Sequence, residues 1–318
     1  MNLTGQAVPA AREHVACIGL GAMGGAMAAR LLAAGHAVQG FDPNPAAMQR
    51  LLALGGGAAT HPADAAREAD VLLMVVHDAT QVEQALFGTD GAASVLRRGA
   101  VVWLASTVTA EAARAFAARL EAMGLSMVDG PVSGGVTGAR AGELTVIAGG
   151  TDAALAAART AMNACASVIH HVGPVGAGAS VKMINNLLAA SHVALTAEAL
   201  AFGVRAGVAP QKLIDVVRQS SGNSRMFDKR APRMAAGEHD PQATVKTFMK
   251  DLGIALDTAR ELGFATPMAA TAQQVFAMAA GLGHAAESDT LLVRVYERLG
   301  GIDVEAAAAL EAGEGKDA

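Results

Sequence analysis

Short apolar runs alternate with helical segments through the first half of the chain. The runs VLLMVV at 71–76 and AVVWLA at 100–105 have no polar position, as is typical of parallel strands that are covered on both faces. The alternation predicts a doubly wound α/β domain. We expect its strands at 15–20, 37–42, 71–76, 100–105, 125–129, 144–149 and 167–172, with helices near 23–34 and 45–53.

The pattern changes at the glycine-rich segment GPVGAG, residues 173–178. Beyond this segment we find no convincing strand, and helical periodicity continues to about residue 312. We therefore expect two domains, an α/β domain at residues 1–174 and an all-helical domain at residues 175–318.

The segment CIGLGAMGG contains the motif G-x-G-x-x-G between a predicted strand and a predicted helix. In such a motif Gly19 permits a tight turn, Gly21 lets the backbone approach a pyrophosphate, and Gly24 lets the helix pack closely on the strand. A glycine turn without a ligand is the alternative, but the strand and helix on either side favour a Rossmann-type dinucleotide site. The predicted cofactor contacts are Gly19, Gly21, Ala22, Met23 and Gly24.

The second predicted strand ends at Asp42, which stands 23 residues after Gly19. A carboxylate at this position accepts hydrogen bonds from ribose hydroxyls and repels a 2′-phosphate, so it favours NAD over NADP. The alternative is that Asp42 only caps the following helix, because the sequence DPNP also suits the start of a helix.

A second glycine-rich segment, DGPVSGGVTGARAGEL at 129–144, follows another predicted strand. Glycines at this density let backbone amides come close to a small ligand, so Ser133 with the amides of Gly134 and Gly135 is suited to a carboxylate. A flexible connector explains the same spacing equally well.

The segment SVKMINNLLAASH places polar residues on an apolar helix. A buried ammonium is costly unless it is paired or its pKa shifts. We therefore interpret Lys182 as a proton-transfer group and Asn186, one turn further on, as a residue that holds a substrate hydroxyl or carboxylate. A solvated helix face is the alternative. On a helix over 180–205 the polar stripe comprises Lys182, Asn185, Asn186, Ala189, His192 and Thr196, beside an apolar stripe of Val181, Ile184, Leu188 and Leu195.

Composition narrows the possible partners and the compartment. The net charge of −5 lacks the basic footprint of nucleic-acid binding, and the longest apolar run, 183–204, is interrupted by polar and charged residues. The N-terminus lacks the pattern of a signal peptide, and Cys17 and Cys165 form no disulfide framework. No clustered set of His, Cys and carboxylates predicts a metal. We expect a cytoplasmic homodimer or homotetramer that needs neither membrane nor nucleic acid.

The chain resembles the β-hydroxyacid dehydrogenases, the group that includes 3-hydroxyisobutyrate dehydrogenase, tartronate semialdehyde reductase and L-threonate dehydrogenase. The resemblance covers about residues 14 to 300 and rests on four motifs in the family's order, IGLGAMGGAMA, DGPVSGGVTGARAGEL, GAGASVKMINN and KDLGIAL. It implies Lys182 as the catalytic lysine, Asn186 as its partner, and Ser133, Gly134 and Gly135 as substrate contacts.

The same resemblance adds cofactor contacts that spacing does not reveal: Val76, His77, Thr107 and Lys250. Without it, Lys250 and Asp251 read as an ordinary surface pair. The family often has Asn where this chain has Arg30, a change that we expect to remove a polar group from helix packing.

Residues 220–234 look most like the L-threonate dehydrogenase branch, which implies NAD-dependent oxidation of a four-carbon sugar acid at C2. A 3-hydroxyisobutyrate dehydrogenase and a semialdehyde or glyoxylate-type reductase stay open as alternatives. A non-catalytic dinucleotide-binding protein would have no reason to combine Lys182 and Asn186 with Ser133. Arg225 either contacts the acid or is an exposed helix arginine.

Overall fold

The computed structural model describes residues 13–314 of the chain. It divides into two compact units, residues 1–182 and 183–318, which we call the first and second units. The division falls inside one long helix, and the domain boundary expected at 174/175 stays a prediction. The N-terminal residues on which the absence of a signal peptide was argued lie largely outside the described residues.

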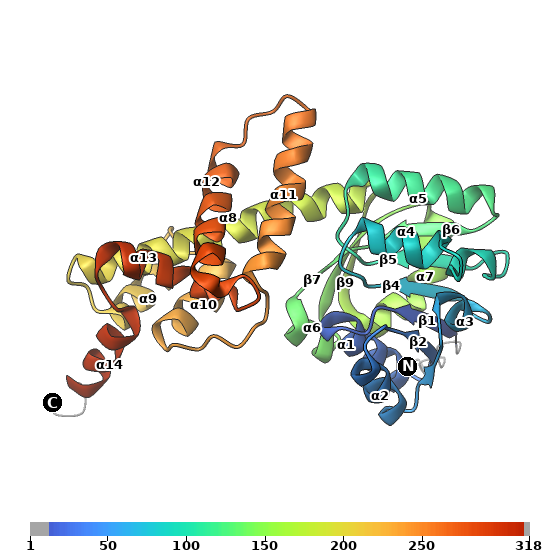
Figure 1. The fold of residues 1–318 in the computed structure, drawn as a ribbon, viewed down its shortest axis with the longest axis horizontal. Helices are drawn as coiled ribbons and strands as arrows, with labels where there is room; N and C mark the ends of the chain where they lie inside the picture. The colour runs from blue at the N-terminus through green and yellow to red at the C-terminus, as the bar shows by residue number, and fades with distance from the viewer. Residues whose placement is uncertain (1–12, 315–318) are drawn as a thin grey trace, which may run out of the picture. The chain divides into compact units, whose positions relative to one another are not determined.

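The first unit is built on a nine-stranded sheet in the order β3-β2-β1-β4-β5-β6-β8-β7, with β9 paired to β8 (Figure 1). Strands β1 to β6 pair in parallel, β8 pairs antiparallel with β6 and β7, and β9 is parallel to β8. Every expected strand is present, and the sequence pattern misses only the two-residue strands β3 and β7. The bounds are β1 His14–Ile18, β2 Ala37–Phe41, β3 Gly57–Ala58, β4 Val71–Met74, β5 Val101–Leu104, β6 Ser126–Asp129, β7 Val132–Ser133, β8 Leu144–Gly149 and β9 Ala166–Gly173.

Helices cover both faces of this sheet (Figure 1). The alternation of side chains along β5 shows why: Val101 and Trp103 belong to one buried cluster, while Val102 and Leu104 belong to the other. A strand that is buried on both faces has no polar positions, as the sequence predicts. The helices are α1 Ala22–Ala33, α2 Pro45–Ala53, α3 Pro62–Ala66, α4 Ala79–Phe87, η1 Ala92–Ser94, α5 Ala110–Ala122, α6 Gly135–Ala141 and α7 Asp152–Cys165.

The second unit is helical, and no strand follows β9 among residues 174–314. Its core gathers small apolar residues of α8 with larger side chains such as Phe248 and Phe276. The helices are α8 Ala177–Arg205, α9 Pro210–Arg218, α10 Arg225–Ala235, α11 Val245–Glu261, α12 Pro267–Ala279, η2 Ala280–His284, η3 Asp289–Leu292, α13 Val293–Gly300 and α14 Val304–Glu314.

Helix α8 buries a different face from the one that the sequence pattern suggests. Ala190, Ala194 and Ala197 face the core, because alanines let neighbouring helices approach closely. The expected apolar stripe is instead exposed, with exposed fractions of 51% at Ile184 and 50% at Leu188. By length and composition α8 also passes for a membrane span, and 44% of its most apolar window is buried inside the structure; one such helix is weak evidence of a membrane.

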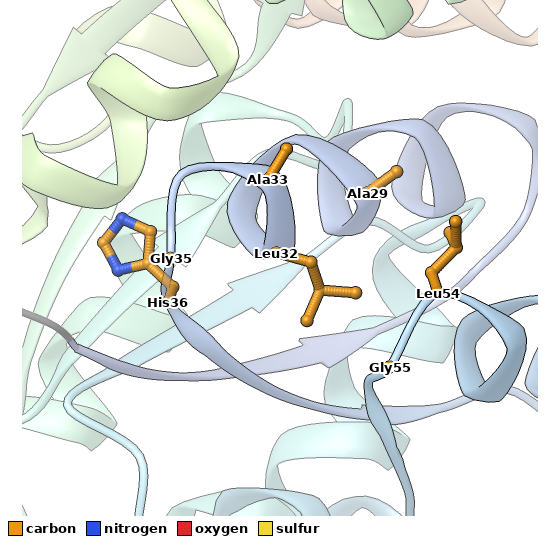
Figure 2. A pocket seen from close by; sticks show the side chains of 7 residues that line it. All are labelled: Ala29, Leu32, Ala33, Gly35, His36, Leu54 and Gly55. Atoms are coloured by element: carbon orange, nitrogen blue, oxygen red, sulfur yellow. The ribbon is translucent and has the colours of Figure 1, made fainter.

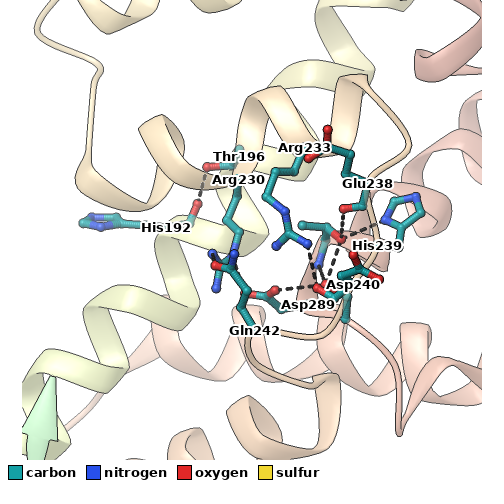
Figure 3. A network of polar contacts seen from close by, with 11 residues as sticks. His192, Thr196, Arg230, Arg233, Glu238, His239, Asp240, Gln242 and Asp289 are labelled. Atoms are coloured by element: carbon teal, nitrogen blue, oxygen red, sulfur yellow. Dashed lines mark hydrogen bonds and ion pairs between the residues drawn. The ribbon is translucent and has the colours of Figure 1, made fainter. Parts of the chain in front are cut away.

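A buried ion pair lies at the centre of a polar network in the second unit (Figure 3). The Nε of Arg230 donates to Oδ2 of Asp289 at 2.7 Å, and its Nη1 donates to Gln242 at 3.2 Å. Burial raises the pKa of Asp289, although the guanidinium opposes this. The pair joins α10 to η3, while His239 and Thr290 extend the network with a 2.8 Å contact.

We predict that Asp289→Ala lowers the free energy of unfolding by about 3–5 kcal/mol, because it leaves the Arg230 guanidinium buried without its carboxylate. Urea-induced unfolding followed by circular dichroism measures the change. The matched control is Asp228→Ala, which breaks the exposed pair with Arg218 and should cost less than about 1 kcal/mol. Equal effects of the two substitutions would contradict the prediction.

Candidate active site

The predicted cofactor and substrate residues of the first unit all follow strands that end at the same edge of the sheet. Because β1, β2, β4, β5 and β6 run in parallel, their carboxyl ends meet there. The loops at this edge carry Gly19 to Gly24 after β1, Asp42 after β2, Val76 and His77 after β4, Thr107 after β5, and Ser133 to Gly135 beyond β6.

Packing requires two of the three motif glycines and leaves the third open. Gly19 has φ of +89°, and a Cβ there would lie 2.2 Å from the carbonyl oxygen of Val75. A Cβ on Gly24 would lie 1.9 Å from the carbonyl oxygen of Gly19. By contrast, a Cβ on Gly21 would meet nothing within 4 Å. Gly21 is therefore not required by the protein's own packing, and the open space beside it fits a pyrophosphate that approaches the backbone.

The N-terminus of α1 lacks a side-chain cap. Its N-cap is Gly21, and its first turn contains no acidic residue. Helices α2, α4, α5 and α7 begin with a side chain that accepts from a first-turn amide, respectively Asn44, Asp78, Thr109 and Thr151. Helix α6, at the predicted substrate turn, also begins at a glycine without a side-chain cap. The amides and the positive end of the α1 dipole are thus left for an anion, so the residues present fit a dinucleotide.

Asp42 does not cap the following helix, because Asn44 accepts from the Ala46 amide and fills that role. Instead, Oδ2 of Asp42 accepts from the amide of Leu20 at 2.7 Å, and Oδ1 accepts from the amide of Asn44 at 2.8 Å. The alternative interpretation of Asp42 as a cap is therefore wrong. The carboxylate is held at the end of β2 and against the glycine loop, which is the place expected of a ribose-binding acid.

The loops after β4 and β5 are held together by Ser106, a residue that sequence analysis misses. Its side chain is buried, and its Oγ accepts from the amide of Val76 at 2.8 Å. The amide of His77 donates to Gln81 at 2.9 Å, so the predicted cofactor loop has a defined backbone. Thr107 follows Ser106 and is half-buried. A lone serine at a strand end carries no sequence signal that separates this role from an ordinary turn.

The second glycine-rich segment is ordered and is not a flexible connector. Ser133 lies in β7 and pairs with Thr145 of β8, and α6 begins at Gly135. Gly134 and Gly135 have φ of +134° and +68°, conformations that favour glycine. Ser133 and these two amides therefore occupy a fixed turn beside the carboxyl edge of β6.

Arg30 contributes to helix packing. Its Nε donates to the carbonyl oxygen of Ala164 near the end of α7 at 3.4 Å. Its guanidinium also lies against Gly142, the C-cap of α6, where a Cβ would be 2.7 Å from Nε. The expectation that Arg30 removes a polar packing group is wrong, because a cation at two helix C-termini is favourable.

The start of α8 is joined to the end of β6 by a buried carboxylate. Oδ2 of Asp129 accepts from the amide of Ala179 at 2.8 Å, and the residue is 1% exposed. Burial raises the pKa of Asp129 to about 6, against the opposing effect of nearby amides, chiefly that of Ala179. Lys182 follows Ala179 by three positions on α8 and is half-buried. The helix that carries the predicted catalytic lysine therefore starts at the same edge of the sheet as the predicted cofactor loops.

In the second unit, Asn186 is fixed by a hydrogen bond to a buried acid. Its Nδ2 donates to Oδ2 of Asp251 at 2.7 Å, and its Oδ1 accepts from Asn185 at 3.1 Å. The Nζ of Lys250 lies 3.1 Å from Oδ1 of Asp251. Asp251 is only 6% exposed, so the interpretation of this pair as an ordinary surface pair is wrong. The motif KDLGIAL was the available signal for Asp251. Arg225, by comparison, is exposed at the start of α10.

A pocket open to solvent lies at the other end of α1 (Figure 2). It is lined by Ala29, Leu32, Ala33, Gly35, His36, Leu54 and Gly55. His36 is the one titratable residue of this lining, and burial lowers its pKa. A ligand site usually combines an apolar wall with several converging polar groups, which this pocket lacks.

A glycine turn that opens an uncapped helix at the carboxyl edge of a parallel sheet defines a Rossmann-type dinucleotide-binding protein. A model of the NAD-binding domain of 6-phosphogluconate dehydrogenase matches residues 14–173. A model for the NAD-binding region of NADP-dependent 3-hydroxyisobutyrate dehydrogenase matches residues 176–296. The chain belongs to the β-hydroxyacid dehydrogenase family, and it is an oxidoreductase that uses a nicotinamide dinucleotide.

Named relatives include several substrate branches. The chain is 42% identical to an L-threonate dehydrogenase of Cupriavidus necator, over 89% of this chain and 96% of that one. It is 37% identical to a 3-hydroxyisobutyrate dehydrogenase of Pseudomonas aeruginosa, over 83% of this chain and 91% of that one. A crystal structure of a 3-hydroxyisobutyrate dehydrogenase from Salmonella typhimurium matches with a TM-score of 0.82 and 40% identity, over 89% and 99% of the two chains.

Proposed function

We propose that this protein oxidises L-threonate at C2 to the 2-oxo acid, with NAD as the hydride acceptor and Lys182 as the general base. The observation that carries the substrate is the 42% identity to the Cupriavidus necator L-threonate dehydrogenase over nearly the whole of both chains. The 3-hydroxyisobutyrate dehydrogenase of Pseudomonas aeruginosa, at 37% identity, supports a second candidate substrate.

The fixed turn at Ser133, Gly134 and Gly135 is suited to the substrate carboxylate. The Ser133 hydroxyl and the two backbone amides are hydrogen-bond donors that carry no charge of their own. Positive φ at both glycines sets the direction of their amides before substrate arrives. Binding therefore requires little reordering of this turn, which favours a single orientation of the acid.

Lys182 would take the proton of the hydroxyl that is oxidised, and NAD, held by the glycine loop at Gly19 to Gly24, would supply the hydride acceptor. Lys182 is half-buried, and its amine is a group that can exchange a proton with a substrate hydroxyl. Asn186 stands four positions further along α8 and holds the substrate hydroxyl in line. Asp251 acts through Asn186, because its hydrogen bond at 2.7 Å fixes the orientation of the amide.

We predict that the protein with NAD forms NADH fastest with L-threonate among L-threonate, D-threonate, 3-hydroxyisobutyrate and D-glycerate, measured at 340 nm.

In the same assay Lys182→Ala should lower kcat by about 10²–10⁴-fold, the range for loss of a general base, while NAD affinity changes little.

Lys246→Ala is a matched control, because it removes another lysine of the chain that has no proposed role. A preference for 3-hydroxyisobutyrate would keep the mechanism and replace the substrate. An unchanged kcat in Lys182→Ala would contradict the proposed mechanism.

We propose NAD as the preferred cofactor. The support for this is that Asp42 follows β2 and that the Leu20 amide of the glycine loop donates to its carboxylate, because an acid after the second strand of a Rossmann fold binds the ribose and repels a 2′-phosphate. The double substitution Asp42→Ser with Pro43→Arg removes the carboxylate, keeps a hydroxyl acceptor for the Leu20 amide, and adds a cation for a 2′-phosphate. We predict that the ratio of kcat/KM for NAD to that for NADP falls about tenfold or more.

The control for this substitution is Asn44→Ala, which removes the cap of α2 without touching the proposed ribose contact. Its cofactor ratio should match that of the unaltered protein. An unchanged ratio in the double variant would show that Asp42 serves only the glycine loop.

We also propose that the protein is a cytoplasmic homo-oligomer in which a second copy covers the exposed face of α8. Val181, Leu188, Leu195 and Phe202 recur at intervals of seven residues on this face and have exposed fractions of 43–73%. Cys17 and Cys165 are both buried free thiols, as is common in a reducing compartment.

We predict that Leu188→Glu with Leu195→Glu lowers the mass in solution, measured by sedimentation velocity, to that of a single chain. A charged residue in the centre of an apolar interface leaves a buried charge without a partner. Leu310→Glu alters a still more exposed leucine outside this face and should leave the mass unchanged. A single-chain mass before any substitution would contradict the proposal.

A further inference from the structure

Asp129 is enclosed where β6, β8 and the start of α8 meet. A Cβ on Gly149 would lie 2.3 Å from Oδ1 of Asp129, and a Cβ on Gly178 would lie 2.2 Å from its carbonyl oxygen. Glycine at both positions therefore lets the neighbouring strand and helix close around the carboxylate. Its Oδ2 accepts from the amide of Ala179 in the first turn of α8 at 2.8 Å.

The anchoring of α8 differs from the capping of the other helices in the first unit. Thr109 and Thr151 cap α5 and α7 from the position just before each helix. The acceptor for the Ala179 amide lies 50 residues away in sequence. A local cap steadies only the end of its own helix, whereas Asp129 attaches α8 to the sheet.

The backbone on the other side of Asp129 is also held in place. The amide of Gly130 donates to the carbonyl oxygen of Leu104 at 2.9 Å, and its own carbonyl oxygen accepts from Nε1 of Trp103 at 2.8 Å. Asp129 thus joins two parts of the proposed site: the start of the segment that carries Ser133, and the helix turn that precedes Lys182.

We infer that Asp129 is a positioning residue for Lys182, whose carboxylate sets the first turn of α8 and thereby the place of the lysine relative to the substrate turn. This inference rests on the proposed role of Lys182 as general base. Asp129 touches neither substrate nor cofactor and acts only through α8.

Stability by itself gives no reason for a carboxylate at this position. Burial raises the pKa of Asp129 to about 6 from 3.8, so folding favours its protonated form. That stabilisation is complete below the unfolded pKa and is lost as pH rises through 6. At pH 8 the ionised group therefore costs stability, and Asp129→Asn should unfold at a temperature no lower than that of the unaltered protein.

The experiment compares Asp129→Asn, Lys182→Ala and the double variant in the full chain at pH 8, with NAD and L-threonate or whichever acid the panel selects. We expect Asp129→Asn to lower kcat by about 10–100-fold, because the amide nitrogen of Asn cannot accept from the several backbone amides that the carboxylate faces, those of Ala179, Gly176 and Gly178, and a displacement of about 1 Å is enough for such a loss. NAD affinity, measured by isothermal titration, should change less than about twofold, since the glycine loop is untouched. The double variant should be no slower than Lys182→Ala alone, because a residue that acts through the lysine has no effect once the lysine is gone.

Thr151→Ala is the matched control, because it removes the cap of α7, a helix that carries no site residue. It should lower the unfolding temperature and leave kcat unchanged, the opposite of Asp129→Asn. If Asp129→Asn fails to fold, Asp129→Ser is assayed by the same criteria, and failure of both to fold would overturn the inference in favour of a purely structural residue.

The outcomes separate the inference from the function on which it rests. An unchanged kcat in Asp129→Asn would overturn the positioning role, and so would losses in kcat that multiply in the double variant. In either case a low kcat in Lys182→Ala would still support the proposed mechanism. An unchanged kcat in Lys182→Ala would remove the mechanism itself. A large loss in both single variants that does not multiply supports the inference.

Discussion

Parallel pairing of β1, β2, β4, β5 and β6 is the constraint on which the rest of the first unit depends. Parallel strands need helical crossovers, so both faces of the sheet are covered and the central strands β4 and β5 are apolar at every position. The same pairing brings five strand ends to one edge. Polar residues in loops far apart in sequence, from Gly19 to Ser133, therefore lie along one border of a rigid sheet.

Side-chain caps distinguish α2, α4, α5 and α7 from α1 at the predicted cofactor site and from α6 at the predicted substrate turn, both of which begin at an uncapped glycine. Asn44, Asp78, Thr109 and Thr151 accept from first-turn amides and leave little for a ligand. At α1 the cap is Gly21, which has no side chain and no neighbour near its missing Cβ. An end that is left uncapped costs stability until an anion arrives, so the helix dipole and the open space together account for the nicotinamide dinucleotide that the family uses.

Two buried carboxylates illustrate different solutions to the cost of burying a charge. Asp289 faces the guanidinium of Arg230 at 2.7 Å, so the charge is balanced inside the second unit. Asp129 depends on backbone amides, chiefly that of Ala179, and its pKa is raised to about 6. Burial raises the pKa of both carboxylates, so neither the guanidinium nor the amides remove the whole cost of burial. Burying the charge of Asp129 therefore costs some stability. This cost is understandable if the carboxylate is needed to attach α8 to the sheet.

Local patterns of the sequence determined most of the fold and the composition of the site. Short apolar runs that alternate with helical segments predicted the long strands, because a covered strand tolerates few polar residues. The glycine spacing predicted the turn at Gly19 and Gly24, where packing excludes any side chain. The resemblance to β-hydroxyacid dehydrogenases contributed Val76, His77, Thr107 and Lys250, whose roles stay predictions. The sequence pattern did not predict the short strands β3 and β7, because two residues are too few to show a pattern.

Only tertiary structure decided which of several chemically similar residues does what. Asp42 and Asn44 both suit a helix start in sequence, and the contact with Leu20 separates them. Asp251 reads as a surface residue until its hydrogen bond to Asn186 is seen, and the outward face of α8 reads as its buried face. The physical reason is the same in each case. Periodicity and motifs report on neighbours along the chain, whereas burial and hydrogen-bond partners depend on segments 20 to 65 residues away, as for Leu20 with Asp42 and Asn186 with Asp251.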